Sequence, residues 1–229
     1  MTSKNQHMYN EFQLVYNNLE SNQSAGLDTF EISSYLTDAY HAYVTSLYGQ
    51  YEKEEDARKA LLPLVKTVTI PKYAGAGFNT DKISDDSVFF DLDNNETSDI
   101  LYVVYEALKM NSKAEPCMRN KLIEIIPVTH DEFHNIKNNP FRYNNRRALR
   151  MDFSLSDGKR IAEVITKDKN CEYYVRYIRK PKPIILKDLT PPDIIQGMTT
   201  ETECELDEIY FKDIVRIAAE MAANDYKTR

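Results

Sequence analysis

The chain of 229 residues is 42% apolar and 28% charged, which is the composition of an ordinary globular protein and excludes a disordered tail. Its formal net charge is -7, so the chain lacks the excess of basic residues that is typical of proteins that wrap DNA. No apolar run approaches the roughly 20 residues that span a bilayer, and the N-terminal MTSKNQHMYN has no signal-peptide core, so we expect synthesis in a cytoplasm and no membrane partner.

Residues 1–70 have the period of α-helices. Two apolar stripes recur at spacings of three and four, which predicts two amphipathic helices. The stripes are Tyr9, Phe12, Val15, Tyr16 and Leu19, then Ile32, Tyr35, Leu36, Ala39, Tyr43 and Leu47. Asp28 and Glu31 have the spacing of a capping box before the second helix. A third helix is predicted from about Glu52, with an apolar face that includes Leu64 and Val65, and Pro63 should kink or shorten it.

Residues 71–190 have the character of β-strands, rich in Val, Ile, Tyr and Phe. The predicted strands are 87–92, 100–110, 121–128, 149–155, 161–166 and 171–178. Asp157-Gly158 is a strong hairpin signal, and the last three strands read as a meander. Pro181 and Pro183 should end the ladder, because proline has no N–H to donate.

Residues 191–229 hold a Pro-Pro turn, a polar linker and a final helix that Asp207 caps. The helix has an apolar stripe and needs a packing partner, which the N-terminal helices can supply. We therefore predict an α+β fold, in which N-terminal helices and a C-terminal helix build a helical bundle around an inserted, mainly antiparallel β domain. The expected domains are 1–70, 71–190 with an extended basic-proline arm, and 191–229.

Three motifs could carry chemistry, and none is convincing. His130 and His134 are four apart, as in a helical metal site, but no third ligand follows, and Thr129 with Glu132 reads as a capping box. The acidic segment 91–96 fails the calcium-loop pattern, and the glycines of 74–78 precede no helix that could bind phosphate. Cys117, Cys171 and Cys204 form no CxxC pair. We expect no cofactor, no metal and no enzymatic activity.

Two basic clusters are candidates for an interface. Arg142, Arg146 and Arg147 lie in the polar segment FRYNNRR. Arg179, Lys180 and Lys182 line the arm, next to the apolar run Ile184, Ile185 and Leu186. A solvated face explains such runs equally well. We expect the three apolar residues to be covered by the β domain or by a neighbouring subunit, and the basic residues to pair with acids on that neighbour.

Three segments carry a resemblance to a known family: EISSYLTDAYHAYVTSLY (31–48), YIRKPKPIIL (177–186), and CELDEI (204–209) with the apolar-periodic run to Tyr226. In pattern and spacing they resemble the head-to-tail connector or ring proteins of tailed bacteriophages, especially the crAss-like group. The resemblance implies a structural virion protein, a subunit of a neck ring that is often a dodecamer. Such a homo-oligomer binds the portal and the adjacent neck or tail ring proteins and leaves a channel for DNA.

The content of 16 Tyr, 9 Phe and no Trp also favours an assembly subunit, because tyrosine suits surfaces that a neighbour covers. Two alternatives stay open. One is a monomeric protein-binding adaptor unrelated to phages, and the other is a metal-dependent hydrolase that uses His130 and His134.

Overall fold

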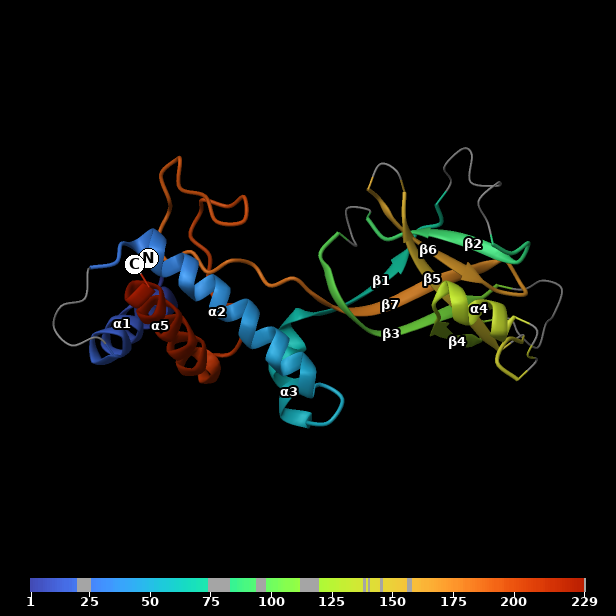
Figure 1. The fold of residues 1–229 in the computed structure, drawn as a ribbon, viewed down its shortest axis with the longest axis horizontal. Coiled ribbons are helices and arrows are strands. Elements are labelled where there is room, and N and C mark those ends of the chain that lie inside the picture. Colours follow the sequence, from blue (N-terminus) through green and yellow to red (C-terminus); the bar gives the residue numbers. More distant parts are fainter. Residues whose placement is uncertain are drawn as a thin grey trace. The chain divides into compact units, whose positions relative to one another are not determined.

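The computed structural model describes residues 1–19, 26–73, 83–93, 98–111, 120–137, 139, 141–144, 146–155 and 158–228 (Figure 1). The chain divides into two compact units. Unit 1 comprises Met1–Leu64 and Lys180–Arg229, and unit 2 comprises Val65–Arg179. The protein is therefore of mixed α+β class, with the helical and the β parts of the sequence in separate units.

Unit 1 is built from helices. They are α1 (Ser3–Leu19), α2 (Thr29–Gln50), α3 (Glu55–Leu61), the 3-10 turns η1 (Leu62–Leu64) and η3 (Glu208–Tyr210), and α5 (Phe211–Thr228). Helix α5 packs against both α1 and α2 (Figure 1). The predicted stripes supply the core, in which Phe12, Leu36 and Ile214 are completely buried. Burial of these faces stabilises helices that would be marginal in isolation.

Helix α2 begins with the predicted capping box. The Asp28 carboxylate accepts a hydrogen bond from the Glu31 backbone N–H at 2.7 Å, and the Glu31 side chain accepts one from the Asp28 N–H at 3.1 Å. These two bonds satisfy backbone donors that the helix itself leaves unpaired. The prediction of this helix start is confirmed.

We expect Asp28→Ala to lower the free energy of unfolding of unit 1 by about 1 kcal/mol, the usual cost of a lost N-cap. Urea unfolding followed by circular dichroism at the helical band measures the loss. Asp38→Ala is the matched control, because Asp38 is exposed in the middle of α2. Equal losses in the two variants would contradict a capping role.

Unit 2 is a curled seven-stranded sheet in the order β1-β7-β3-β4-β5-β6-β2. The strands are β1 (Val65–Ile70), β2 (Ser87–Asp91), β3 (Ile100–Met110), β4 (Leu122–Pro127), β5 (Arg147–Ser154), β6 (Arg160–Ile165) and β7 (Cys171–Arg179). Every pairing is antiparallel except that of β4 with β5, which is parallel. The short helix α4 (His130–Ile136) connects these two strands, as parallel neighbours require a crossover.

Two apolar clusters build the core of unit 2. The larger gathers residues from most strands, among them Phe90, Leu108 and Tyr173. The smaller packs Phe133 and Ile136 of α4 against β5 and β6. Because successive side chains of a strand point to opposite faces, neighbouring residues of β5, Ala148 and Leu149, belong to different clusters.

Two sequence predictions about unit 2 are wrong. Residues 65–70 form strand β1 and do not extend the third helix, which ends at Leu61 before Pro63. The predicted meander is also interrupted, because β6 pairs with β5 and β2, whereas β7 pairs with β1 and β3. At the hairpin between β5 and β6, Gly158 has a φ of +85°, which suits glycine; Asp157 lies outside the described residues.

Candidate interaction surfaces

The first basic cluster lies on one loop, residues 139–147, which we call the basic loop. It connects α4 to β5. Backbone bonds fold it tightly: the N–H groups of Arg142 and Tyr143 donate to the Asn139 carbonyl at 3.1 and 2.9 Å. The Asn139 side chain accepts from the Phe141 N–H at 3.0 Å. The described residues of this loop are thus held by bonds between near neighbours in the sequence.

Tyr143 anchors the basic loop to the sheet. Its ring is buried, and its hydroxyl donates to the Asp86 carboxylate at 2.8 Å. Lys167 Nζ lies 4.5 Å from the centre of the Tyr143 ring and 3.1 Å from the same carboxylate. Burial and the hydrogen bond to Asp86 raise the pKa of Tyr143. Partial burial alone would raise the pKa of Asp86, but the bonds from Tyr143 and Lys167 outweigh it and lower that pKa.

The outer side of the basic loop is polar with one large apolar residue. Arg142 and Arg146 are exposed, and neither has an ion-pair partner within the described ranges. The Phe141 side chain is 83% exposed. Arg147 instead holds the loop together, because its Nη1 donates to the Phe141 carbonyl at 3.1 Å and its Nε lies 3.2 Å from the Glu124 carboxylate. The three predicted arginines thus lie on one loop, and two of them have no ion-pair partner among the described residues.

The arm begins at Arg179, where β7 ends. Lys180 and Lys182 are exposed, and the Lys182 N–H donates to the Glu205 carboxylate at 3.1 Å. Strand β7 ends before Pro181, as predicted. Two of the three predicted basic residues of the arm, Lys180 and Lys182, are therefore exposed, whereas Arg179 is half-buried.

The apolar run of the arm lies in the core of unit 1. Ile184, Ile185 and Leu186 are all completely buried. Their backbone is bonded to α2, because the Ile184 N–H donates to Thr37 Oγ1 at 3.0 Å and the Leu186 N–H to Ser33 Oγ at 3.1 Å. This corrects the expectation that the β domain or a neighbouring subunit covers them. These three side chains pack within the helical unit of the same chain.

The arm also ties distant segments together. The Ile185 backbone pairs with Thr202 through two bonds of 3.0 and 3.1 Å, and its carbonyl accepts from the buried Asn5 side chain at 3.1 Å. The Asn5 amide also donates to the Glu201 carboxylate at 3.1 Å. Residues 180–207 are thus a structural part of unit 1.

A buried ion pair in unit 2 was not predicted. Arg150 of β5 and Glu106 of β3 approach to 2.7 Å, and the Tyr173 hydroxyl donates to the same Glu106 oxygen at 2.6 Å. Burial raises the pKa of Glu106, and the nearby Arg150 only partly offsets that rise. Burial would lower the pKa of Arg150, but Tyr173 and the carboxylates of Glu106 and Asp152 raise it. Both charges are enclosed, so this pair is a structural element.

The outer face of the sheet carries a shallow hollow of about 220 Å³. Tyr105 and Leu122 are its most exposed apolar members, and Lys109, Tyr174 and Arg176 also line it. Alternation along β3 and β7 could have located this face, since residues two apart in a strand share a side.

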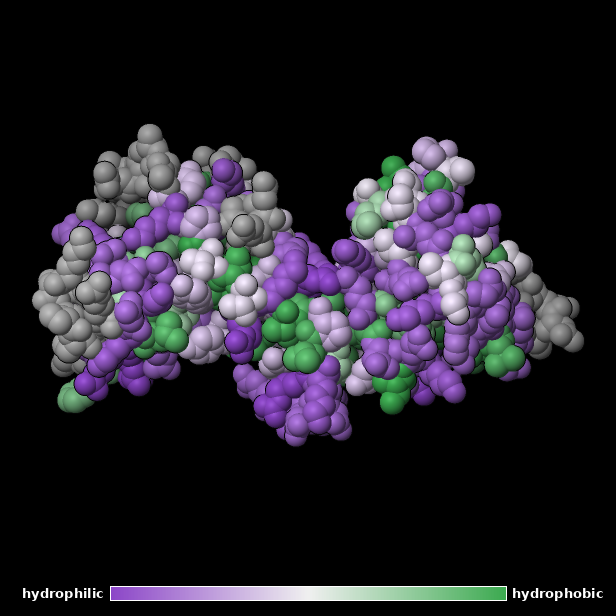
Figure 2. All heavy atoms as spheres, turned by 180° about the vertical axis from the view of Figure 1, so that it is seen from behind, coloured by the Kyte–Doolittle hydropathy of each residue, from purple (hydrophilic) through white to green (hydrophobic). Residues whose placement is uncertain are grey.

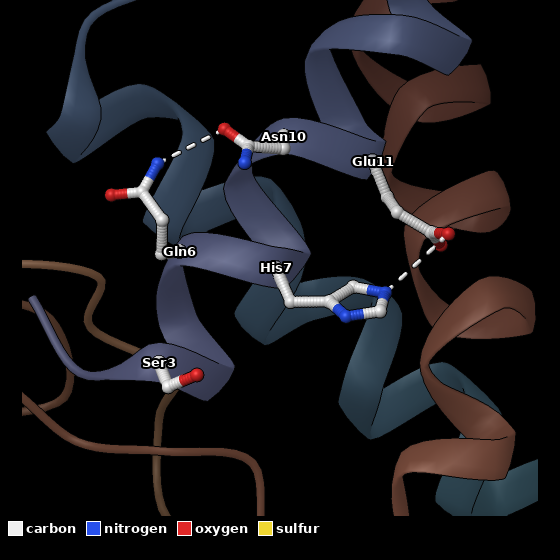
Figure 3. A pocket seen from close by; sticks show the side chains of 5 residues that line it. All are labelled: Ser3, Gln6, His7, Asn10 and Glu11. Atoms are coloured by element: carbon white, nitrogen blue, oxygen red, sulfur yellow. Dashed lines mark hydrogen bonds and ion pairs between the residues drawn. The ribbon is translucent and has the colours of Figure 1, made fainter.

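Helix α1 carries an open polar hollow of about 450 Å³ (Figure 3). Figure 3 shows two pairs along the helix: Gln6 Nε2 donates to Asn10 Oδ1 at 2.9 Å, and His7 Nε2 lies 3.5 Å from Glu11 Oε1. Both pairs have the i,i+4 spacing that makes neighbours on a helix surface. The side chains bond each other along the helix and form no nucleophile–base arrangement.

The structure describes two of the three motifs that could carry chemistry, at least in part. His130 and His134 are exposed on α4, whose start has the predicted capping box of Thr129 and Glu132. Within the described residues, no group of three or more His, Cys, Asp or Glu side chains could hold a metal ion. Asp93 of the acidic turn is bound to the Arg160 guanidinium at 2.7 and 2.9 Å, while residues 94–97 and the glycine segment 74–78 lie outside the described residues.

The visible surface is mainly hydrophilic. Figure 2 shows hydrophilic residues over most of the visible face, with small hydrophobic areas between them. None of the helices in the described ranges is both long and apolar enough to cross a bilayer.

A family model described as phage tail ring protein 3/4 matches residues 1–229. The chain belongs to this family. "Ring protein 3" of Bacteroides phage crAss001 is 31% identical over 221 residues, which cover 92% of this chain and 91% of that protein. "Ring protein 4/5" of the same phage is 26% identical over 229 residues, 95% of this chain and 91% of that protein.

The expected resemblance to ring proteins of crAss-like phages is therefore confirmed. This phage ring protein is a structural component of the virion, and its two relatives are named as ring proteins.

Proposed function

We propose that the chain is one subunit of a homo-oligomeric ring in the neck of the virion, where the ring joins the portal to the tail. The observation that carries this proposal is the family match over the whole chain. The ring would be a dodecamer that binds the portal on one side and an adjacent neck or tail ring protein on the other. It would surround the channel through which DNA passes.

The proposed organisation is a helical bundle from both chain ends with an inserted β domain. The packing of α5 on α1 and α2 supports the bundle, and the division of the chain at Leu64 and Lys180 supports the insertion. Each unit has its own apolar core. A subunit of this kind can offer one unit to a neighbour without disturbing the other, which suits stacked rings.

The charge of the chain fits a ring around DNA. A protein with a formal net charge of -7 gains little from phosphate contacts, because tight DNA binding depends on neutralisation by Lys and Arg. An acidic ring would therefore let DNA pass without holding it. The exposed basic residues Arg142, Arg146, Lys180 and Lys182 are better suited to pairing with acids on other subunits.

The test is to count this chain in purified virions. Quantitative mass spectrometry should find as many copies as of the portal protein, and cryo-electron microscopy should place them as a ring between portal and tail. The major capsid protein, present in many more copies, is the control for calibration. Absence of the chain from purified virions would overturn the proposal, as would any location other than between the portal and the tail.

A further inference from the structure

We propose that the basic loop of one copy docks on an acidic segment, residues 203–209, of the next copy in the ring. This inference rests on the proposed function, because it names the contact that would link adjacent subunits. A ring requires a heterologous contact, in which one surface of a subunit meets a different surface of its neighbour. The basic loop and the acidic segment belong to different units of the chain and supply two such surfaces.

The basic loop has the properties of a preorganised docking element. Among its described residues, Tyr143 is bonded to Asp86 and lies against Lys167, and Phe141 is held by bonds to Asn139 and Arg147. A loop that is ordered before binding loses little conformational entropy on association. What it presents is one exposed aromatic ring, Phe141, and two exposed arginines, Arg142 and Arg146. Aromatic residues, Phe included, and Arg are enriched at the cores of protein interfaces.

The acidic segment has the complementary properties. It contains Glu203, Glu205, Asp207 and Glu208 without a basic residue, and it ends at Ile209, whose side chain is 73% exposed. Glu203 has no ion-pair partner in the part of the chain that the structure describes. Within the described ranges, the one ion-pair contact of Glu208 is a long one of 3.8 Å with Lys4, and both side chains are substantially exposed.

The basic loop and the acidic segment are thus complementary. Each surface combines one large exposed apolar side chain with at least two accessible charges, and the signs are opposite. Contact would cover Phe141 and Ile209 together and pair Arg142 and Arg146 with carboxylates. Complementary charges at an interface set orientation and exclude wrong partners. A second copy is the occupant that fits, because in a ring every copy offers both surfaces.

Charge reversal in trans tests this pairing. One variant carries Arg142→Glu with Arg146→Glu, and the other carries Glu203→Arg with Glu208→Arg. The host supplies them, singly or together, to a phage that lacks the gene, and mass spectrometry counts copies per particle. Each variant alone should lose about tenfold or more in incorporation, because like charges then face each other at every contact.

The two variants supplied together should restore incorporation. In an alternating ring with an even number of copies, each reversed loop meets a reversed acidic segment, and each normal loop meets a normal one. A contact between the loop and the acidic segment within one chain would not be restored by mixing. The control is Lys53→Glu with Arg58→Glu, two exposed basic residues elsewhere that give the same change in charge and should leave incorporation normal.

Normal incorporation of the loop variant alone would overturn the pairing, and so would failure of the mixture to restore it. Purified variants should unfold close to the temperature of the wild type, since Arg142, Arg146 and Glu208 are exposed and Glu203 is only half-buried. Failure of the proposed function is seen separately, in the wild-type particles: they would then contain no ring of this chain.

Discussion

Replacing Ile184 by Ala should lower the free energy of unfolding of unit 1 by about 2–5 kcal/mol, the usual cost of truncating a buried Ile or Leu. Ile184 is completely buried, and its backbone N–H is bonded to Thr37 of α2. Truncation leaves a cavity that the surrounding helices can fill only in part. Urea unfolding followed by helical circular dichroism measures the loss, and hydrogen exchange of α2 should report it locally.

Ile209→Ala is the matched control, because it makes the same chemical change at a side chain that is 73% exposed. It should change the free energy of unfolding by less than about 0.5 kcal/mol. If a neighbouring subunit covered Ile184, as the sequence analysis allowed, its truncation would instead leave the isolated chain stable and impair assembly. A stable Ile184→Ala protein that no longer enters particles would restore that earlier interpretation.

Replacing Arg150 by Met should lower the stability of unit 2 by about 3–5 kcal/mol, because the Glu106 carboxylate is left buried without its cation. The additional change Glu106→Gln should recover most of this loss. Glutamine carries no charge and still offers an oxygen to the Tyr173 hydroxyl. Hydrogen exchange of β3 and β5 distinguishes the single from the double variant. Equal stability of the two would contradict a buried-charge penalty.

The same pair predicts a pH dependence. Burial raises the pKa of Glu106 above its ordinary value of 4.5, so the folded state binds this proton more tightly than the unfolded state. The contribution of Glu106 is therefore fully present below its unfolded pKa and is lost as the pH rises through the folded pKa. Arg150→Met removes the attraction that holds this pKa down, so its loss of stability should shrink as the pH is lowered. Glu106→Gln should abolish that dependence.

Only part of the basic loop could be predicted from the sequence. The cluster of Arg142, Arg146 and Arg147 could be found by inspection, because charge runs are local. The anchor Tyr143 could not, since its partners Asp86 and Lys167 are distant in the chain. For the same reason the exposure of Phe141 could not be foreseen, because an aromatic residue beside a buried Tyr looks equally suited to the core.

Local structure was determined by the sequence itself. The capping boxes at Asp28 and Thr129 and the strand Ile100–Met110 were found where they were predicted, because they depend on side-chain bonds and periodicity within a few residues. Only the tertiary structure decided that β7 joins β1 and β3, and that Ile184, Ile185 and Leu186 lie in the helical unit. The physical reason is that hydrophobic burial is non-directional: an apolar pattern indicates that a face is covered, but not which segment covers it.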